Sequence, residues 1–253
     1  MPMPRKTFSW RKCAGWGLVI SLAMVLAAFW TVRARYENRL RQQIWPAHAP
    51  EVSAISSPVA ASIPTVMLLG DSRIAQWGLP ELKHWRVVNA GAGGLTTGQV
   101  LLATPGLLDE FHPDVVVLQA GINDLKFLGL RPEMASTIVS LAASNLTAIV
   151  SEGAKRHCQV IVLETWPAGR PDWARQLVWN AAIPTSVNQL NAELRKLNAP
   201  EQGIRVIDLF NEAGLKPGGN LYRDTLHFTP EVYQRLAPAL LKALNEGLTK
   251  TPL

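Results

Sequence analysis

The chain has 253 residues, with 25 Lys and Arg against 19 Asp and Glu, and a formal net charge of +6 at pH 7. Residues 1–45 hold eight of the basic residues and one acid, so the 17 basic and 18 acidic residues of 46–253 leave that body with a net charge of −1. This balance argues against an electropositive surface for nucleic acid, and we expect no nucleic-acid partner.

The N-terminal segment contains an uncharged, mostly apolar run, Ala14–Val32, with basic residues on both sides. Its length of about 19 residues suits one membrane-spanning helix. A cleaved signal peptide is the alternative, because it also joins a basic start to an apolar middle. The run ends in the bulky Phe29 and Trp30 instead of a small-residue cleavage site, which favours an uncleaved anchor. We expect residues 1–45 to form an anchor, with its span at about 14–32, and a basic stalk.

The location of the body follows less directly from charge. Four basic residues lie on each side of the apolar run, so the positive-inside rule does not orient it. A lone N-terminal anchor is commonly an export signal, and we expect a single-pass protein whose body is periplasmic or extracytoplasmic, or secreted if the N-terminus is cleaved. The four prolines from Pro46 to Pro64, with Ala and Ser between them, predict a linker over 46–64.

The body, 65–250, alternates short apolar runs with helical patterns. Strands are expected at Val66–Leu69, Arg86–Asn89, Asp114–Gln119, Gln159–Glu164 and Ile204–Leu209. Helices are expected from Thr96 to about Ala103, from Pro132 to about Gly153, and at Thr185–Leu197 and Pro230–Leu248. Strands that alternate with helices predict an α/β domain with a five-stranded parallel sheet covered on both faces.

Three of the expected strands end in polar loops that contain glycine: Gly70-Asp71-Ser72, Ala92-Gly93-Gly94 and Gly121-Ile122-Asn123-Asp124. Parallel strands place such loops at one edge of the sheet, where open α/β sheets bind ligands. The topology therefore predicts that these three loops converge, although they are far apart in the sequence.

Ser72 is the candidate nucleophile, and a hydroxyl needs a neighbouring base. His227 is the candidate base, because Asp224 lies three residues earlier and can hold one ring nitrogen while the other faces the serine. Asp208, at the end of the fifth expected strand, is a rival partner for the histidine. The other histidines of the body, His84, His112 and His157, are more simply read as structural or solvated.

An oxyanion formed at the serine needs hydrogen-bond donors. The backbone N–H groups of Ser72 and Gly94 and the side-chain amide of Asn123 are the candidates, and Gly93 is an immediate rival of Gly94. Glycine is favoured there because the lack of a side chain lets the backbone approach a ligand. Asp71 and Asp124 are expected to hold the backbone of their loops instead of transferring protons.

Over about Val66–Leu240 the chain resembles the SGNH or GDSL hydrolase superfamily. The resemblance is carried by four blocks, in this order: Gly70-Asp71-Ser72, Asn89-Ala90-Gly91-Ala92-Gly93-Gly94, Gly121-Ile122-Asn123-Asp124 and Asp224-Thr225-Leu226-His227. The resemblance implies a three-layer α/β/α flavodoxin-like fold and ester hydrolysis through an acyl-serine, with no metal or organic cofactor. It also implies the same roles: Ser72 as nucleophile, His227 as base, Asp224 as its partner, and Gly94 and Asn123 in the oxyanion hole.

Three further residues are candidates for substrate contacts. Arg73 follows the serine, where the family often has a smaller or apolar residue, and binds an anionic group in one interpretation; in the other it faces solvent or pairs with a carboxylate. Trp166 and Trp173 lie in a segment, Trp166–Pro184, that follows the fourth strand and should border the site. They either stack on a sugar ring or pack the loop onto the body.

The sequence thus predicts a membrane-tethered serine esterase acting on an acyl ester, most simply O-acetyl groups of cell-envelope glycans, with a lipid ester as the next candidate. An O-acyltransferase using the same triad, with a sugar hydroxyl as acceptor, is the first alternative. A catalytically silent glycan-binding module is the second. The sequence indicates no oligomeric state.

Overall fold

The computed structural model describes residues 10–57, 63–173, 175–216 and 218–248. The chain divides into two compact units, Met1–Arg41 and Gln42–Leu253. Parts of three predicted regions lie outside the described residues: 1–9 of the anchor, 58–62 of the linker and 249–250 of the domain.

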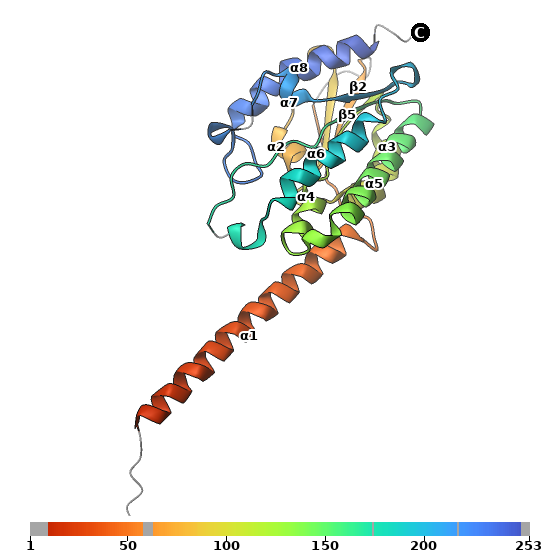
Figure 1. The fold of residues 1–253 in the computed structure, drawn as a ribbon. Helices are drawn as coiled ribbons and strands as arrows, with labels where there is room; N and C mark the ends of the chain where they lie inside the picture. The colour runs from red at the N-terminus through yellow and green to blue at the C-terminus, as the bar shows by residue number, and fades with distance from the viewer. Residues whose placement is uncertain (1–9, 58–62, 174, 217, 249–253) are drawn as a thin grey trace, which may run out of the picture. The chain divides into compact units, whose positions relative to one another are not determined.

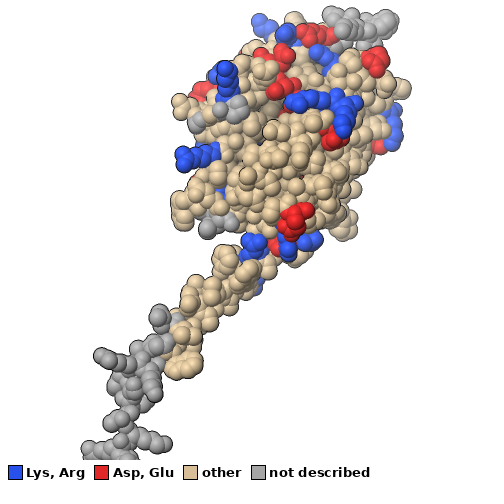
Figure 2. Space-filling view, in the orientation of Figure 1, with Lys and Arg blue, Asp and Glu red and all other residues tan. Residues whose placement is uncertain are grey.

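Helix α1 (Trp10–Ile44) contains both the predicted span and the predicted stalk. Much of its visible surface carries neither basic nor acidic side chains (Figure 2). Its segment Val19–Ile44 has a mean hydropathy of 1.3 and none of the apolar window is buried. Among the described residues one other segment, Pro132–Lys155, is long and apolar enough to cross a membrane, but a third of its window is buried in the domain. The N-terminal helix is therefore compatible with a membrane anchor or a signal sequence.

The second unit is built on a six-stranded sheet of order β1-β3-β2-β4-β5-β6 (Figure 1). The strands are β1 (Ile55–Ser56), β2 (Thr65–Gly70), β3 (Arg86–Gly91), β4 (Val115–Gln119), β5 (Gln159–Leu163) and β6 (Ile204–Ile207). Strands β2 to β6 are the five predicted strands and all pair in parallel. Their order is that of the flavodoxin-like sheet, in which the first strand lies between the second and the third.

The sheet is mixed, and the prediction of five strands, all parallel, was wrong in this respect. Strand β1 pairs antiparallel with β3, with Ile55 opposite Asn89 and Ser56 opposite Val88. It lies within the predicted linker, and a strand of two residues is too short to show an alternating hydrophobic pattern. The pairing covers the outer edge of β3, which would otherwise present unpaired backbone groups.

Helices cover both faces of this sheet, which gives three layers (Figure 1). On one face lie α3 (Thr97–Phe111), α4 (Ile122–Leu125), α5 (Ala135–Lys155) and α6 (Ala182–Arg195); on the other lie α2 (Ser72–Trp77), α7 (Leu209–Glu212) and α8 (Pro230–Leu248). Five 3-10 helices complete the described elements: Lys126–Gly129, Pro132–Met134, Arg175–Val178, Pro200–Gln202 and Gly219–Leu221. Helix α3 runs eight residues beyond its predicted end near Ala103, because its buried apolar face continues through Leu107 and Leu108.

The core explains why the loops at the strand ends are held firmly. Every residue of β2 and β4 is buried, as expected for central parallel strands covered on both faces. On the face of α2 and α8 an aromatic cluster joins the helices to the sheet, with Trp77, Trp166, Phe228 and Tyr233 among its members. Ser72 and Asn123 follow the two central strands, β2 and β4, so the buried centre of the sheet sets their positions.

Candidate active site

Ser72 lies in a turn after β2 that requires glycine two residues before it, at Gly70. Gly70 has φ +158°, and a Cβ at this position would lie 1.9 Å from the carbonyl oxygen of Gln119. The next residue, Asp71, caps helix α2: its Oδ1 accepts a hydrogen bond of 2.9 Å from the backbone N–H of Arg73. Ser72 therefore begins α2 with its position fixed by the turn and the cap.

The structure brings Ser72, His227 and Asp224 together. The Oγ of Ser72 lies 2.9 Å from Nε2 of His227, and Nδ1 of the same ring lies 2.7 Å from Oδ2 of Asp224. Ser72 is 155 residues away from His227 in the sequence, and both side chains are partly exposed. This is the arrangement in which a carboxylate orients an imidazole and the imidazole takes a proton from a hydroxyl.

The spacing between Asp224 and His227 is explained by a local turn. One carboxylate oxygen of Asp224, Oδ1, accepts hydrogen bonds from the backbone N–H groups of Leu226 (2.8 Å) and His227 (3.1 Å), which leaves Oδ2 for the imidazole. Burial acts to raise the pKa of Asp224, but the hydrogen bonds from the His227 ring and the two backbone groups lower it to about 2. Asp208, the rival partner, instead caps α7 by accepting from the N–H of Asn211 at 3.0 Å.

The loops after β3 and β4 meet beside the nucleophile, where the sheet order switches direction. The side-chain amide of Asn123 donates to the carbonyl oxygen of Leu95 at 2.8 Å, which holds it next to the Gly93-Gly94 turn. Gly94 has φ +77°, a conformation that favours glycine, and a Cβ there would lie in open space because no protein atom approaches it closely. The close backbone approach occurs at Gly91, where a Cβ would lie 2.4 Å from the backbone nitrogen of Ala75.

Asp71 and Asp124 hold loop backbone, as the sequence indicates. The carboxylate of Asp124 accepts from the backbone N–H and from the hydroxyl of Thr97 at 2.9 Å and 2.7 Å. Both aspartates are fully buried. Burial raises the pKa of Asp71, and it raises the pKa of Asp124 to about 6 although the Thr97 bonds oppose this.

Arg73 does not have the position that a substrate contact requires, so that hypothesis is corrected. The side chain is completely buried, and its guanidinium donates to three carbonyl oxygens, those of Leu226 (2.9 Å), Pro167 (2.9 Å) and Trp166. Leu226 lies between Asp224 and His227, so Arg73 ties the start of α2 to the histidine turn. Burial lowers the pKa of Arg73, and the nearby Asp71 carboxylate opposes that shift.

The two tryptophans of the segment after β5 differ. Trp166 is buried in the aromatic cluster, with ring centroids 6.0 Å from Trp77 and 5.5 Å from Phe228, so it cannot stack on a sugar. Trp173 is 81% exposed and stays a candidate for substrate contact. The packing interpretation therefore holds for Trp166, because a large apolar ring gains more in the core than at a surface.

One residue near the triad was given no role by the sequence reasoning. Nη1 of Arg175 lies 3.7 Å from Oδ1 of Asp224. Nothing in the residue pattern identifies this contact, because Arg175 and Asp224 come from separate loops.

Asn89 has a structural role, since its amide donates to the carbonyl oxygens of Ile74 and Gly78 and supports the end of α2.

The remaining histidines of the body lie outside the site. His84, His112 and His157 each have a positive φ, of 69°, 42° and 60°, and so occupy left-handed turn positions. Within the described residues there is no group of three or more His, Cys, Asp or Glu side chains that could hold a metal ion.

The fold and the site together define a class: flavodoxin-like α/β proteins that carry a Ser–His–Asp triad at the carboxyl edge of the sheet. The chain belongs to the GDSL-like lipase/acylhydrolase family, whose model matches residues 68–235. It is 32% identical over 104 residues to an arylesterase from Vibrio mimicus, covering 35% of this chain and 50% of that protein. It is 33% identical over 110 residues to esterase TesA from Pseudomonas aeruginosa, covering 38% and 53%. The chain thus spans about half the length of these curated relatives.

Solved structures show the same fold. A GDSL-like lipase from Bacteroides thetaiotaomicron superposes with a TM-score of 0.57 at 15% sequence identity, and the match covers 83% of this chain and 97% of that one. At this identity the similarity concerns the fold alone.

Proposed function

We propose that this protein hydrolyses carboxylic esters through an acyl-serine intermediate. The observation that carries the proposal is the pair of hydrogen-bond distances through His227, 2.9 Å to Ser72 and 2.7 Å to Asp224. The family match and the similarity to an arylesterase and an esterase support it.

The chemistry follows from these positions. The Oγ of Ser72 forms a bond to the carbonyl carbon, and its proton moves to Nε2 of His227. The carbon–oxygen bond to the alcohol then breaks, and the imidazolium returns the proton to the leaving alkoxide. Water adds to the acyl carbon, gives its proton to His227, and the acid departs as Ser72 recovers its hydrogen. Asp224 stabilises the imidazolium in both halves.

The negative oxygen of each tetrahedral intermediate is assigned to the side of the loops after β3 and β4. The backbone N–H groups of Ser72 and Gly94 and the amide of Asn123 are the proposed donors. One hydrogen of the Asn123 amide is used by Leu95, which leaves the other for the oxyanion. No metal or organic cofactor takes part in this proposal.

The test is steady-state hydrolysis of p-nitrophenyl acetate by the full-length protein and by Ser72→Ala. Removal of the nucleophile should lower kcat by about three or more powers of ten. Equal activity of the two proteins would remove Ser72 from the mechanism. Free acetate as the product identifies hydrolysis, whereas an acetylated sugar formed in the presence of glycan would identify acyl transfer.

We further propose that helix α1 anchors the protein and that the catalytic unit lies outside the cytoplasm. The apolar window within Val19–Ile44, none of which is buried, supports the anchor. Digestion of intact and of permeabilised cells with a protease tests it: cleavage of the catalytic unit before the inner membrane is opened is expected, and protection until then would contradict it.

A further inference from the structure

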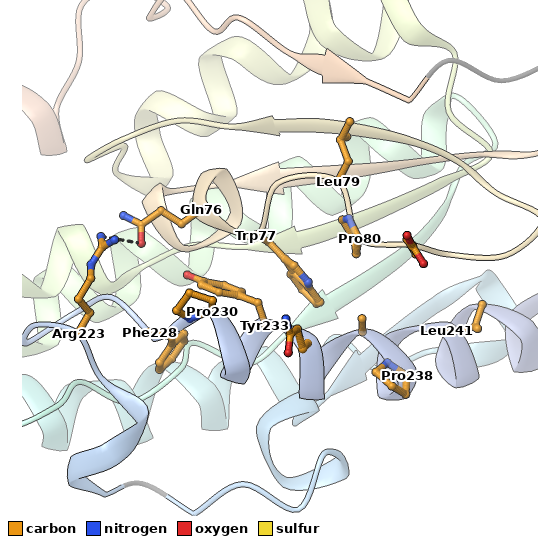
Figure 3. A pocket seen from close by; sticks show the side chains of 13 residues that line it. Gln76, Trp77, Leu79, Pro80, Arg223, Phe228, Pro230, Tyr233, Pro238 and Leu241 are labelled. Carbon is orange, nitrogen blue, oxygen red and sulfur yellow. Dashed lines mark hydrogen bonds between the residues drawn. The ribbon is translucent and has the colours of Figure 1, made fainter.

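An open groove runs along the face of the domain between α8 and the segment that follows α2 (Figure 3). Its volume is about 690 Å³, within the range of small-molecule sites. Leu79 and Pro80 lie on one wall, and Pro230, Pro238 and Leu241 lie on the other, along α8 (Figure 3). Pro230 and Leu241 are separated by about 16 Å of helix, so the groove is elongated.

Nine of the residues that line this groove are apolar or aromatic, and four are polar or charged: Gln76, Glu81, Arg223 and Gln234. Trp77, Phe228 and Tyr233 line it together with the aliphatic residues, and Leu79 is 37% exposed. A cleft that combines apolar and aromatic side chains with a few polar groups commonly marks a binding site. The elongated shape fits a flexible hydrocarbon chain better than a compact polar ligand.

One end of the groove adjoins the triad. Gln76 lies one helical turn after Ser72 on the same face of α2, and Arg223 directly precedes Asp224. The guanidinium of Arg223 donates to Oε1 of Gln76 at 3.3 Å, and this exposed pair forms the end of the groove (Figure 3). The backbone N–H of Arg223 also donates to the carbonyl oxygen of His227 at 2.8 Å, which ties this end of the groove to the histidine turn.

The direction of the reaction decides which half of an ester lies there. The imidazole of His227 must protonate the leaving oxygen, so the alcohol lies on the histidine side of Ser72. The oxyanion lies on the other side, with Gly94 and Asn123. The groove, bounded by Arg223, Phe228 and α8, belongs to the histidine side.

From this geometry we infer that the groove binds the apolar chain of the alcohol half of the ester, so that the substrate is an ester of a hydrocarbon-bearing alcohol. The inference rests on the proposed function and names the substrate class of the same site. The Gln76–Arg223 pair meets the polar part of the ester, and the chain extends from there along α8.

Two isomeric esters test the inference: hexyl acetate and ethyl hexanoate. They have the same atoms and put the long chain on opposite sides of the ester bond. The full-length protein in lipid nanodiscs, which avoid detergent in the groove, should show a kcat/KM for hexyl acetate higher by about tenfold or more.

Two variants change the groove, and each has a matched control. Ala237→Trp fills the groove from α8, and its control, Ala148→Trp, places the same ring on α5. Leu79→Ser removes an apolar side chain from the groove wall, and its control, Leu102→Ser, changes a similarly exposed leucine (42% exposed) on α3. The groove variants should lose most of the preference for hexyl acetate over ethyl hexanoate. The controls should keep the preference.

Three results would overturn the inference. The parent shows no preference for hexyl acetate over ethyl hexanoate, or this preference survives in Ala237→Trp. In the third, the parent prefers ethyl hexanoate and Ala237→Trp abolishes that preference, which would assign the groove to the acyl chain. Calorimetric titration of the Ser72→Ala protein with 1-hexanol gives a readout without turnover. Binding that is lost in the Ser72→Ala/Ala237→Trp double variant is expected, and equal heats in both would count against the groove. If the protein hydrolyses none of the esters but hexanol binding is lost in the double variant, the proposed hydrolysis is refuted and the hydrocarbon-binding groove is supported.

Discussion

The two sides of Ser72 are held by different means. On the oxyanion side, the loops after β3 and β4 bond directly to each other, through Asn123 to Leu95 and through Asp124 to Thr97. On the histidine side, residues 222–228 come from near the other end of the chain. They are joined to α2 by the buried Arg73, by the exposed Arg223–Gln76 pair and by the hydrogen bond of His227 to Ser72. The order of parallel strands is sufficient to assemble the first side, whereas the second depends on a long-range contact between a side chain and backbone carbonyls.

The largest expected effect is on the histidine side. Asp224→Asn should lower kcat by about four powers of ten, because an amide does not hold the imidazole in the tautomer that accepts the serine proton. The variant should still fold, since the amide oxygen can accept from Leu226 and His227, although the stabilisation that belongs to the charged carboxylate is lost. Kinetics with p-nitrophenyl acetate measures this, and a kcat within about tenfold of the parent would refute the role of Asp224.

The second expected effect is on folding. Arg73→Met should lower the free energy of unfolding by about 3 kcal/mol or more, because three carbonyl oxygens lose their donor and the buried Asp71 loses its neighbouring charge. Denaturation by guanidinium chloride, followed by tryptophan fluorescence, measures it.

Arg175→Gln is the matched control for this change. It removes a partly exposed arginine from the neighbourhood of the same triad, and we expect a loss within about 1 kcal/mol. Equal losses for the two variants would show that Arg73 is not the contact that joins α2 to the histidine turn.

On the oxyanion side the effect should be catalytic and smaller. Asn123→Ala should lower kcat by about two to three powers of ten, with KM close to the parent value, because its amide acts on charge that develops in the transition state. Asn145→Ala is the control: it removes a hydrogen bond of 3.0 Å to Thr97 in the same network but no proposed oxyanion donor. A similar loss of kcat in both variants would indicate a general loosening of the loops.

The smallest expected effect is a pH dependence of stability from Asp124. A carboxyl whose pKa is raised to about 6 by burial binds its proton more tightly in the folded state. The contribution of Asp124 to the free energy of unfolding is therefore complete below about pH 4, the pKa of the unfolded state, and is lost as the pH rises through 6. The parent should lose no more than about 3 kcal/mol through this group between pH 4 and pH 7.

Asp124→Asn should remove that slope, as followed by unfolding at several pH values. Asp208→Asn, which changes the cap of α7, is the control and should keep the slope. A slope that persists unchanged in Asp124→Asn would mean that the carboxyl of Asp124 does not titrate in this range.

The comparison of the two sides also explains what the sequence could predict. Ser72 and Asn123 follow central strands, and Asp224 and His227 share a turn, so spacing and sheet order indicate that all four converge. The burial of Arg73 depends on carbonyls more than ninety residues away, and no local pattern reveals it. The predicted substrate contact was therefore wrong for Arg73 and for Trp166. For Trp166 the alternative, packing of the loop onto the body, is confirmed, whereas Arg73 does not face solvent either.

Other features escaped prediction for related reasons. Strand β1 has two residues and no alternation to detect, so the mixed character of the sheet was missed. The groove is formed by α8 and the segment after α2, about 150 residues apart, and becomes visible only when the helices are packed.

Labelling with diisopropyl fluorophosphate tests the central claim, that Ser72 is a nucleophile activated by His227, most directly. The Oγ of Ser72 forms a bond to phosphorus, fluoride leaves, and the serine proton passes to His227. Mass spectrometry of the digested full-length protein should find one phosphoryl adduct, on the peptide that contains Ser72, and none after His227→Ala. An adduct on another residue, or labelling of Ser72 that is equally fast without His227, would contradict the account.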